Sequence, residues 1–484
     1  MTMMTLPRSD ERIAASFRDP SGYVFKREGV LLRQVNQRYR EDYDLLMSSG
    51  LYERLASKGL LIEHTEVDVP PLQPETAYKI IKPSVVPFIS YPFEWPFSAL
   101  KDAALTTLRI HRAALRHGMV LKDASAYNIQ FIGSRPVLID TLSFARYVPG
   151  EPWIAYGQFC RHFLAPLALM AMRDVRLSLL LQSHIDGIPL DLAASLLPWK
   201  ARLKFGLLIH LISHARAQSR YADAGRESSK KFQVQVSPAK MNALIENLIA
   251  TVQSLDWTPA GTEWGDYYSD TNYSNEALDG KGKLVRQFLD QLKPRTVWDL
   301  GANTGLFSRL GAQMGAYTLS ADIDPAAVEK NYRAAKQASE ANLLALRLDL
   351  TNPSPAIGWA NEERQAFDQR GHADVALGLA LIHHLAIGNN TPLPDIARFF
   401  ARLCDHLILE FVPKEDSQVK RLLATREDIF PDYTEEGFEK AFSGNFDLVE
   451  KIRVPDACRT LYLLKRKADG ALHDTELSRN ANPV

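Results

Sequence analysis

The chain has 484 residues, 46% hydrophobic and 24% charged, so a folded protein of more than one domain is expected and a mostly disordered chain is excluded. Lys and Arg together number 57, as do Asp and Glu, and this balance argues against nucleic acid as a partner. Cys160, Cys404 and Cys458 are too few and too far apart for a disulfide framework or a CxxC metal site, so we expect no metal centre.

Neither a signal peptide nor a membrane span is expected. The opening residues, MTMMTLPRSDER, lack the apolar core of a signal peptide. The apolar run FLAPLALMAM at residues 163–172 is too short to cross a bilayer. We therefore expect a cytoplasmic protein.

The first motif in chain order is HGMVLKDASAYNIQFIGSRPVLIDTLSF at residues 117–144. Within it, Asn128 follows Asp123 by five residues, and Asp140 follows the β-like stretch PVLI. A long helical stretch over 98–117 precedes the motif. This arrangement resembles the catalytic and metal-binding loops of the protein-kinase-like fold, over residues 20–215. The resemblance implies that Asp123 positions an acceptor hydroxyl and that Asn128 and Asp140 bind Mg²⁺ and nucleotide.

The same region departs from that fold's pattern in three ways. Asp140 is followed by Thr-Leu instead of Phe-Gly, and no Gly-rich phosphate loop precedes the motif. Arg33 stands where a phosphate-pairing lysine is expected, and arginine is not its equivalent. We therefore predict a degenerate kinase-like α+β lobe with a helical region, in which Asp123, Asn128 and Asp140 are possible nucleotide-binding residues. The alternative is an unrelated α+β domain in which they are turn and cap residues.

Residues 216–264 are expected to hold a linker and helices, because the stretch 219–235 is polar. The next segment, GTEWGDYYSDTNYSNEALDGKGKL at residues 261–284, is aromatic, polar and glycine-bearing. Such a segment can cover a cofactor and wall an acceptor pocket, with Tyr268, Tyr273 and Lys283 as candidate contacts. An ordinary connector whose aromatic residues pack on the domain is the alternative. The polar tail at 468–484 is expected to be flexible.

Strands and helices alternate from about residue 295 to 466, which predicts a wound, largely parallel sheet within a domain at 265–467. The sequence TVWDLGANTGLFSRLGAQMGA at 296–316 predicts a strand over Thr296–Leu300, a tight turn and an amphipathic helix. Gly301 and Gly305 permit close approach of a ligand, and Asn303 tolerates positive φ. Asp299, at the strand end, can order the loop or accept a hydrogen bond from a ligand amine.

Acidic residues close the next two predicted strands. YTLSADID ends at Asp322, 23 residues after Asp299, where a carboxylate can bind two ribose hydroxyls; Asp324 is its rival. LLALRLDL ends at Asp349, a candidate for an adenine amino group or a helix cap. The fourth strand is DVALGLAL at 374–381, and the fifth, HLILEFVP at 406–413, carries Glu410. The last two strands could pair as a hairpin.

Residues 265–467 resemble the class I S-adenosylmethionine-dependent methyltransferases. Four motifs in chain order carry the resemblance: DLGANTG, ADIDP, RLDL and DVALGLALIHHL. The resemblance implies an α/β, Rossmann-like, seven-stranded sheet whose last strand pair breaks the parallel pattern, and S-adenosyl-L-methionine as the cofactor. It also implies a distribution of contacts along that cofactor. Asp299, Gly301, Asn303 and Gly305 would hold the methionine moiety, Asp322 the ribose and Asp349 the adenine.

Candidate catalytic residues follow the fourth and fifth strands. A neutral imidazole of His383 or His384 could take the proton of an attacking hydroxyl, and Glu410 could orient it or bind the acceptor. Alternatively, one histidine packs under the loop and the other caps the next helix.

The sequence therefore predicts a methyltransferase acting on an oxygen of a small molecule or saccharide, with the N-terminal lobe recognising the acceptor or regulating the enzyme. Two alternatives stay open: a bifunctional kinase–methyltransferase acting on a glycan end, and a non-catalytic scaffold in which both lobes are relics.

Overall fold

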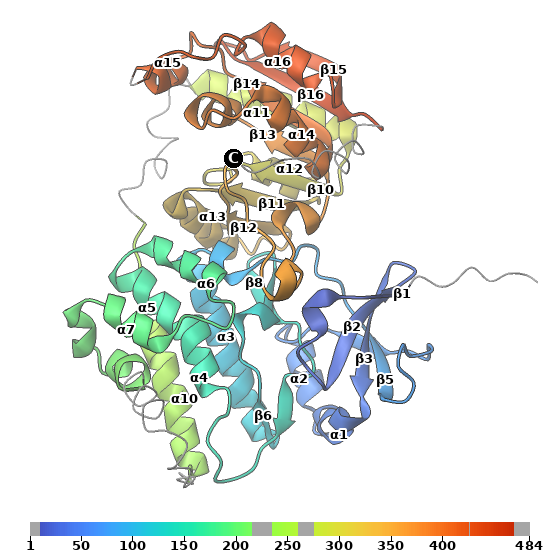
Figure 1. Ribbon diagram of the computed structural model, residues 1–484, viewed down its shortest axis with the longest axis vertical. Helices are drawn as coiled ribbons and strands as arrows, with labels where there is room; N and C mark the ends of the chain where they lie inside the picture. The colour runs from blue at the N-terminus through green and yellow to red at the C-terminus, as the bar shows by residue number, and fades with distance from the viewer. Residues whose placement is uncertain (1–9, 215–234, 260–274, 425, 469–484) are drawn as a thin grey trace, which may run out of the picture. The chain divides into compact units, whose positions relative to one another are not determined.

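The computed structural model describes residues 10–214, 235–259, 275–424 and 426–468. The chain forms two compact units (Figure 1). Unit 1 comprises residues 1–258 and 356–365, and unit 2 comprises residues 259–355 and 366–484. None of the described helices is long and apolar enough to cross a bilayer.

Unit 1 begins with a five-stranded antiparallel sheet in the order β1-β2-β3-β5-β4. Its strands are β1 (Asp10–Arg12), β2 (Gly22–Arg27), β3 (Val30–Asn36), β4 (His64–Glu66) and β5 (Ala77–Pro83). Helices α1 (Arg40–Ser48) and α2 (Leu51–Ala56) lie between β3 and β4 in the chain. Tyr39 and Tyr43 pack with Val35, Ile81 and Leu142, which joins the sheet to the chain segments beyond it.

The second part of unit 1 is built around α3 (Phe97–Arg116), which occupies the stretch for which a helix is predicted. The motif at 117–144 folds into two antiparallel ribbons: β6 (Met119–Leu121) pairs with β9 (Phe144–Arg146), and β7 (Ile129–Ile132) pairs with β8 (Arg135–Leu138). The helices that follow these ribbons in the described residues are α4 (Tyr156–Phe159), η5 (Cys160–Leu164), α5 (Ala165–Met172), η6 (Val175–Leu179), α6 (Leu180–Ser183), α7 (Leu190–Leu196), η7 (Trp199–Leu203), α8 (Phe205–Leu207), η8 (Leu208–Ser213) and α10 (Pro238–Gln253). Helix α10 packs on α3.

A short piece of the C-terminal sequence belongs to unit 1. Residues 356–365 lie inside the range 265–467 predicted as one domain, yet they pack with the N-terminal residues. The contact is specific, because Arg18 donates two hydrogen bonds to the carboxylate of Glu363, at 2.7 and 2.8 Å. Arg364 lies over the ring of Tyr127 at 4.7 Å. The polypeptide therefore leaves unit 2 after residue 355, contributes residues 356–365 to unit 1, and returns to unit 2 at residue 366.

Unit 2 is a seven-stranded sheet in the order β12-β11-β10-β13-β14-β16-β15. Its strands are β10 (Thr296–Leu300), β11 (Tyr317–Asp322), β12 (Leu343–Arg347), β13 (Ala373–Gly378), β14 (Cys404–Phe411), β15 (Phe446–Arg453) and β16 (Thr460–Arg466). Strands β10 to β14 are parallel, whereas β16 runs antiparallel to both β14 and β15. The predicted seven-stranded α/β sheet, with a last strand pair that breaks the parallel pattern, is confirmed.

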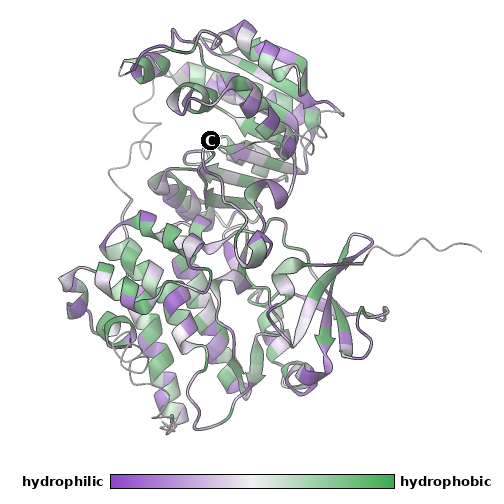
Figure 2. Ribbon diagram, viewed as in Figure 1, coloured by the Kyte–Doolittle hydropathy of each residue, from purple (hydrophilic) through white to green (hydrophobic). Residues whose placement is uncertain are grey.

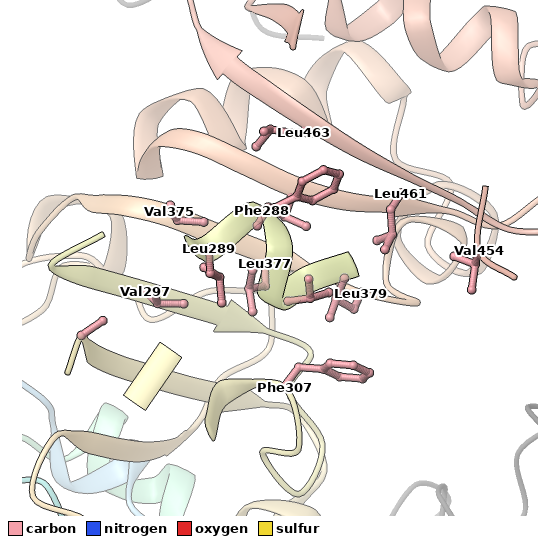
Figure 3. Packing of buried hydrophobic residues seen from close by; sticks show 13 residues of the cluster. Phe288, Leu289, Val297, Phe307, Val375, Leu377, Leu379, Val454, Leu461 and Leu463 are labelled. Atoms are coloured by element: carbon pink, nitrogen blue, oxygen red, sulfur yellow. The ribbon is translucent and has the colours of Figure 1, made fainter. Parts of the chain in front are cut away.

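The core of unit 2 lies between this sheet and its helices. Those helices are α11 (Asn275–Leu292), α12 (Ser308–Gln313), α13 (Pro325–Gln337), η13 (His384–Gly388), α14 (Leu393–Leu403), α15 (Ser417–Leu423) and α16 (Glu435–Phe442). Figure 3 shows Phe288 and Leu289 of α11 close to Val297, Val375 and Leu377 of the central strands. In Figure 2 the helices carry hydrophilic and hydrophobic residues in alternation, as expected when one face of each is buried.

Three strands end earlier than the sequence indicates. β12 ends at Arg347, two residues before Asp349, and β13 ends at Gly378 although the apolar run continues to Leu381. The third, β14, ends at Phe411 instead of residue 413. Ala380 explains the second difference: its φ is +49°, and its backbone N–H leaves the ladder to donate to Glu410 at 2.7 Å. A buried carboxylate therefore ends the strand where hydrophobicity alone would extend it.

Candidate functional site

The loop after β10 turns through three residues with left-handed backbone angles. The φ values are +83° for Gly301, +50° for Asn303 and +79° for Gly305. A Cβ atom on Gly305 would lie 2.5 Å from the side-chain oxygen of Asn331, so only glycine fits there. Asparagine is among the few other residues that tolerate such angles, which accounts for Asn303. The loop is thus a cradle of backbone groups at the carboxyl edge of the sheet.

Asp322 holds this loop in place. Its carboxylate accepts the backbone N–H of Asn303 at 2.7 Å and that of Asp324 at 2.8 Å. Burial raises the pKa of Asp322 to about 6. Asp324 is the alternative ribose-binding candidate in the sequence. Its carboxylate instead caps α13 by accepting the N–H groups of Ala326 and Ala327. Asp322 therefore bonds the cradle, whereas Asp324 caps the next helix.

Asp299 lies under the same loop and is 2% exposed. It accepts the hydroxyl of Ser308 at 2.6 Å, and that hydroxyl is also 2.7 Å from the Ser320 hydroxyl. Burial raises the pKa of Asp299 to about 7, because the ionised carboxylate loses its hydration. This residue and Ser320 therefore tie the start of α12 to strands β10 and β11.

Two other predicted cofactor residues, Asp349 and Lys283, have partners outside the loop. Asp349 follows β12, and its carboxylate accepts the N–H and the hydroxyl of Thr351 at 2.8 and 2.6 Å, which closes a local turn. Lys283 is on the solvent side of α11, where it pairs with Asp279 at 2.8 Å. Tyr268 and Tyr273 lie outside the described residues.

Lys281, on the opposite side of α11, is the buried lysine beside the cradle. Its ammonium is 2.6 Å from the Glu410 carboxylate and 4.8 Å from the centre of the Phe307 ring. Burial lowers its pKa, and Glu410 opposes that effect. The sequence carried a signal for this position, because Lys281 interrupts the apolar stripe Ala277, Leu284, Val285 and Phe288 at helical spacing.

Glu410 is the centre of a buried charge network. It is 0% exposed, and one carboxylate oxygen accepts both the Lys281 ammonium and the Ala380 N–H. Its other oxygen is 3.8 Å from Arg459, whose guanidinium binds Asp416 at 2.7 Å. Two cations and two carboxylates therefore compensate one another, as buried charges require. Sequence reasoning missed Lys281, Arg459 and Asp416, and found only Glu410.

His383 and His384 follow Ala380 at the end of β13. Their ring centres are 4.1 Å apart, and His383 is 1% exposed with no hydrogen-bond partner for its Nδ1 among the described residues. Burial lowers the pKa of His383, and it lowers that of His384 to about 4; the positive charge of Arg459 adds to both effects. Both imidazoles are therefore neutral at neutral pH and able to accept a hydrogen bond.

The structure also brings the predicted N-terminal residues close together. Asp140 pairs with Arg33 at 2.6 Å and accepts the N–H of Leu142 and the hydroxyl of Ser143 at 3.0 and 2.6 Å. Burial and the charge of Asp140 raise the pKa of Asp123, which a hydrogen bond from Asn128 partly offsets. Asn128 also donates to Ser143 at 3.4 Å.

Asp140 already pairs with Arg33 and accepts hydrogen bonds from Leu142 and Ser143, so a divalent cation here would have to compete with the Arg33 guanidinium. The described residues also contain no group of three or more His, Cys, Asp or Glu that could hold a metal ion.

Comparison with solved structures finds low similarity over less than half of this chain. Magnesium protoporphyrin IX methyltransferase (ChlM) of Synechocystis PCC 6803, with bound SAH, has a TM-score of 0.30 and 19% identity, over 41% of this chain and 91% of that one. The bifunctional kinase-methyltransferase WbdD has a TM-score of 0.28 and 19% identity, over 43% of each chain. N-methyltransferase NodS of Bradyrhizobium japonicum WM9 has a TM-score of 0.29 and 12% identity, over 40% and 98%.

Comparison of sequences is more informative. No protein-family model matches the chain. The nodulation protein NoeA of Rhizobium meliloti (strain 1021) is 36% identical over 466 residues, which is 94% of this chain and 96% of the relative. Identity at this level over nearly the whole length of both proteins means that the chain belongs to the family of the nodulation protein NoeA.

Proposed function

We propose that unit 2 transfers a methyl group from S-adenosyl-L-methionine to an oxygen of a small molecule or saccharide. The observation that carries the proposal is the cradle after β10, with Asp322 bonded to the Asn303 N–H at 2.7 Å. A glycine-bearing loop between the first strand and its helix, with an acid at the end of the neighbouring strand, suits a nucleoside ligand. The strand order of the sheet supports the same assignment.

The residues of the cradle fit this cofactor by their shape and charge. Gly301 and Gly305 allow the positive φ angles that would shape the loop around the methionine moiety, and Asp299 bonds Ser308 at the start of the following helix. Asp322 would bind the ribose hydroxyls, and Asp349 the adenine amino group. When bound, the cofactor supplies an electrophilic methyl group. The protein then has to align the acceptor oxygen with it and receive the acceptor's proton.

Neutral imidazoles favour an oxygen acceptor. His384 would accept the hydroxyl proton, and the buried ring of His383 lies against it. Glu410 is a positioning residue instead of a base, because Lys281 and the Ala380 N–H already occupy one of its oxygens. It holds the turn that leads from β13 to the two histidines.

The N-terminal unit would recognise the acceptor or regulate the reaction. The name of the 36% identical relative places that protein in nodulation, and we propose the same process for this chain. A saccharide acceptor is consistent with the balanced charge of the sequence, which offers no excess of cations for nucleic acid.

Binding of S-adenosylhomocysteine, measured by titration calorimetry on the full chain, tests the cofactor. We expect binding by the wild type and a loss of roughly 10- to 100-fold with Asp322→Asn, because charge-assisted hydrogen bonds contribute about 1.5–3 kcal/mol. Asp395→Asn, in an exposed ion pair of α14, is the matched control and should bind normally. Absence of binding by the wild type would refute the proposal and leave the scaffold alternative.

Transfer of labelled methyl groups tests the acceptor. The protein is incubated with methyl-labelled cofactor and an extract, which is then separated into protein, nucleic-acid, saccharide and small-molecule fractions. Label in the saccharide or small-molecule fraction that disappears with Asp299→Ala supports the proposal. Label confined to protein or nucleic acid would contradict the proposed acceptor class, while leaving the cofactor assignment intact.

Phosphoryl transfer by unit 1 is the second candidate function, favoured by the convergence of Asp123, Asn128 and Asp140. It requires Mg²⁺ to compete with the Arg33 guanidinium for the Asp140 carboxylate. Transfer of labelled γ-phosphate from ATP to a glycan end, lost with Asp123→Asn, would support it. Failure of the wild type to bind ATP with Mg²⁺ would refute it.

A further inference from the structure

A short stretch of unit 1 exposes four large apolar side chains. The exposed fractions are 67% for Trp199, 73% for Leu203, 68% for Phe205 and 40% for Ile209. They lie on η7, α8 and the beginning of η8, and we call them, with the residues between, the 199–209 surface. Isolated exposed apolar residues are ordinary, whereas four so close together mark a surface that another phase or molecule covers.

Cations alternate with these apolar residues. Lys200, Arg202 and Lys204 are all exposed. The sequence contains no acidic residue between Asp191 and Asp223. Lys204 reaches the Ser254 carbonyl at 3.4 Å, and in the described part of the chain Lys200 and Arg202 have neither a hydrogen-bond nor an ion-pair partner. The stretch is therefore apolar and cationic at once.

The exposed side chains stand on a firmly packed base. Ala201 and Leu207 are both 0% exposed. A Cβ atom on Gly206 would overlap the side chain of Thr251 on α10, so the backbone lies directly against that helix. The protein thus fixes Ala201 and Leu207 inside the unit and, between them, holds Leu203 and Phe205 outside.

We propose that the 199–209 surface docks on an anionic lipid bilayer. Trp199, Leu203 and Phe205 would enter the headgroup region, where amphipathic and aromatic side chains are favoured, and the three cations would meet lipid phosphates. A protein interface usually has an apolar centre and a polar rim. Here apolar and cationic residues alternate along seven positions, WKARLKF at 199–205. A bilayer suits this pattern, because the cations can remain at the headgroup phosphates while the neighbouring apolar side chains reach the acyl chains below. This proposal does not depend on methyl transfer.

Flotation of the full-length protein with lipid vesicles tests the proposal. We compare vesicles of phosphatidylcholine alone with vesicles that also contain phosphatidylglycerol. The wild type should float with the anionic vesicles, and much less with the neutral ones or at high salt. The triple variant Lys200→Gln, Arg202→Gln, Lys204→Gln should lose on the order of 100-fold in partitioning to anionic vesicles.

Two further variants test whether the apolar side chains of the 199–209 surface are needed for vesicle binding, or whether the loss of any exposed apolar side chain has the same effect. Leu203→Ser with Phe205→Ser should abolish flotation, and because both residues are exposed, the fold should survive. Trp359→Ser is the matched control: Trp359 is 75% exposed outside the 199–209 surface, and its loss should leave flotation unchanged.

Three results would overturn the proposal. The first is failure of the wild type to float with either vesicle. The second is equal flotation of the wild type and both 199–209 variants. The third is a concentration-dependent dimer in sedimentation, without flotation, that Leu203→Ser with Phe205→Ser dissociates; the 199–209 surface would then be a contact between copies of the chain.

Discussion

Removal of the Lys281 ammonium should destabilise unit 2 far more than removal of a neighbouring surface lysine. Lys281→Met keeps the length of the side chain but leaves Glu410 buried at 0% exposure. Glu410 retains the Ala380 N–H at 2.7 Å and Arg459 at 3.8 Å. Loss of one partner of a buried pair costs about 3–5 kcal/mol, and the remaining partners place the cost near 3 kcal/mol.

Lys283→Met is the matched control on the same helix. The Lys283–Asp279 pair has side chains 77% and 69% exposed, so its loss should cost about 0.5 kcal/mol or less. The double variant Lys281→Met with Glu410→Gln removes both buried charges and keeps an acceptor for the Ala380 N–H. It should therefore be more stable than Lys281→Met alone, although it carries more substitutions.

Hydrogen–deuterium exchange is the appropriate assay, because a melt of two compact units would mix their transitions. Peptides that cover β10 and β13 report on unit 2 alone. A loss of 3 kcal/mol corresponds to exchange roughly 150-fold faster in those strands for Lys281→Met. Equal exchange in Lys281→Met and Lys283→Met, or a double variant less stable than Lys281→Met, would refute the reasoning.

Three further predictions concern single residues of unit 2. Burial lowers the pKa of His384 from 6.5 to about 4, so between these values only the unfolded chain binds a proton there, and the free energy of unfolding falls as the pH drops. In the free energies of opening of β10 and β13, measured by hydrogen–deuterium exchange at pH 7.5 and pH 5, His384→Gln should remove about 2 kcal/mol of that fall, and an unchanged fall would contradict the shift. Asn303→Gly should retain the exchange protection of β10 and S-adenosylhomocysteine binding, whereas Asn303→Val should lower both, because φ is +50°; equal behaviour would show that the loop relaxes. Asp324→Ala should cost about 1 kcal/mol as a lost helix cap without weakening that ligand, and weakened binding would assign Asp324 to the site.

Much of unit 2 could be predicted because its signals are local. The strand Thr296–Leu300 has the predicted bounds, since an apolar run meets a glycine turn. Asn303 adopts the positive φ that its side chain tolerates, and the last two strands pair as the expected hairpin. Each of these features depends on residues within a few positions of one another, where turn chemistry and side-chain period act directly.

Which charged residues gather beside the cradle was decided only by the tertiary structure. Lys281 and Lys283 are indistinguishable by chemistry, but α11 buries the first, which bonds Glu410 at a separation of 129 positions. Asp322 and Asp324 are likewise equivalent candidates in the sequence. In the folded chain Asp322 bonds the loop after β10, and Asp324 caps α13. The return of residues 356–365 to unit 1 depends on Arg18, 345 positions from Glu363. Pairings of this kind follow from how distant segments pack, so composition and periodicity determine the elements, and packing determines which side chains meet.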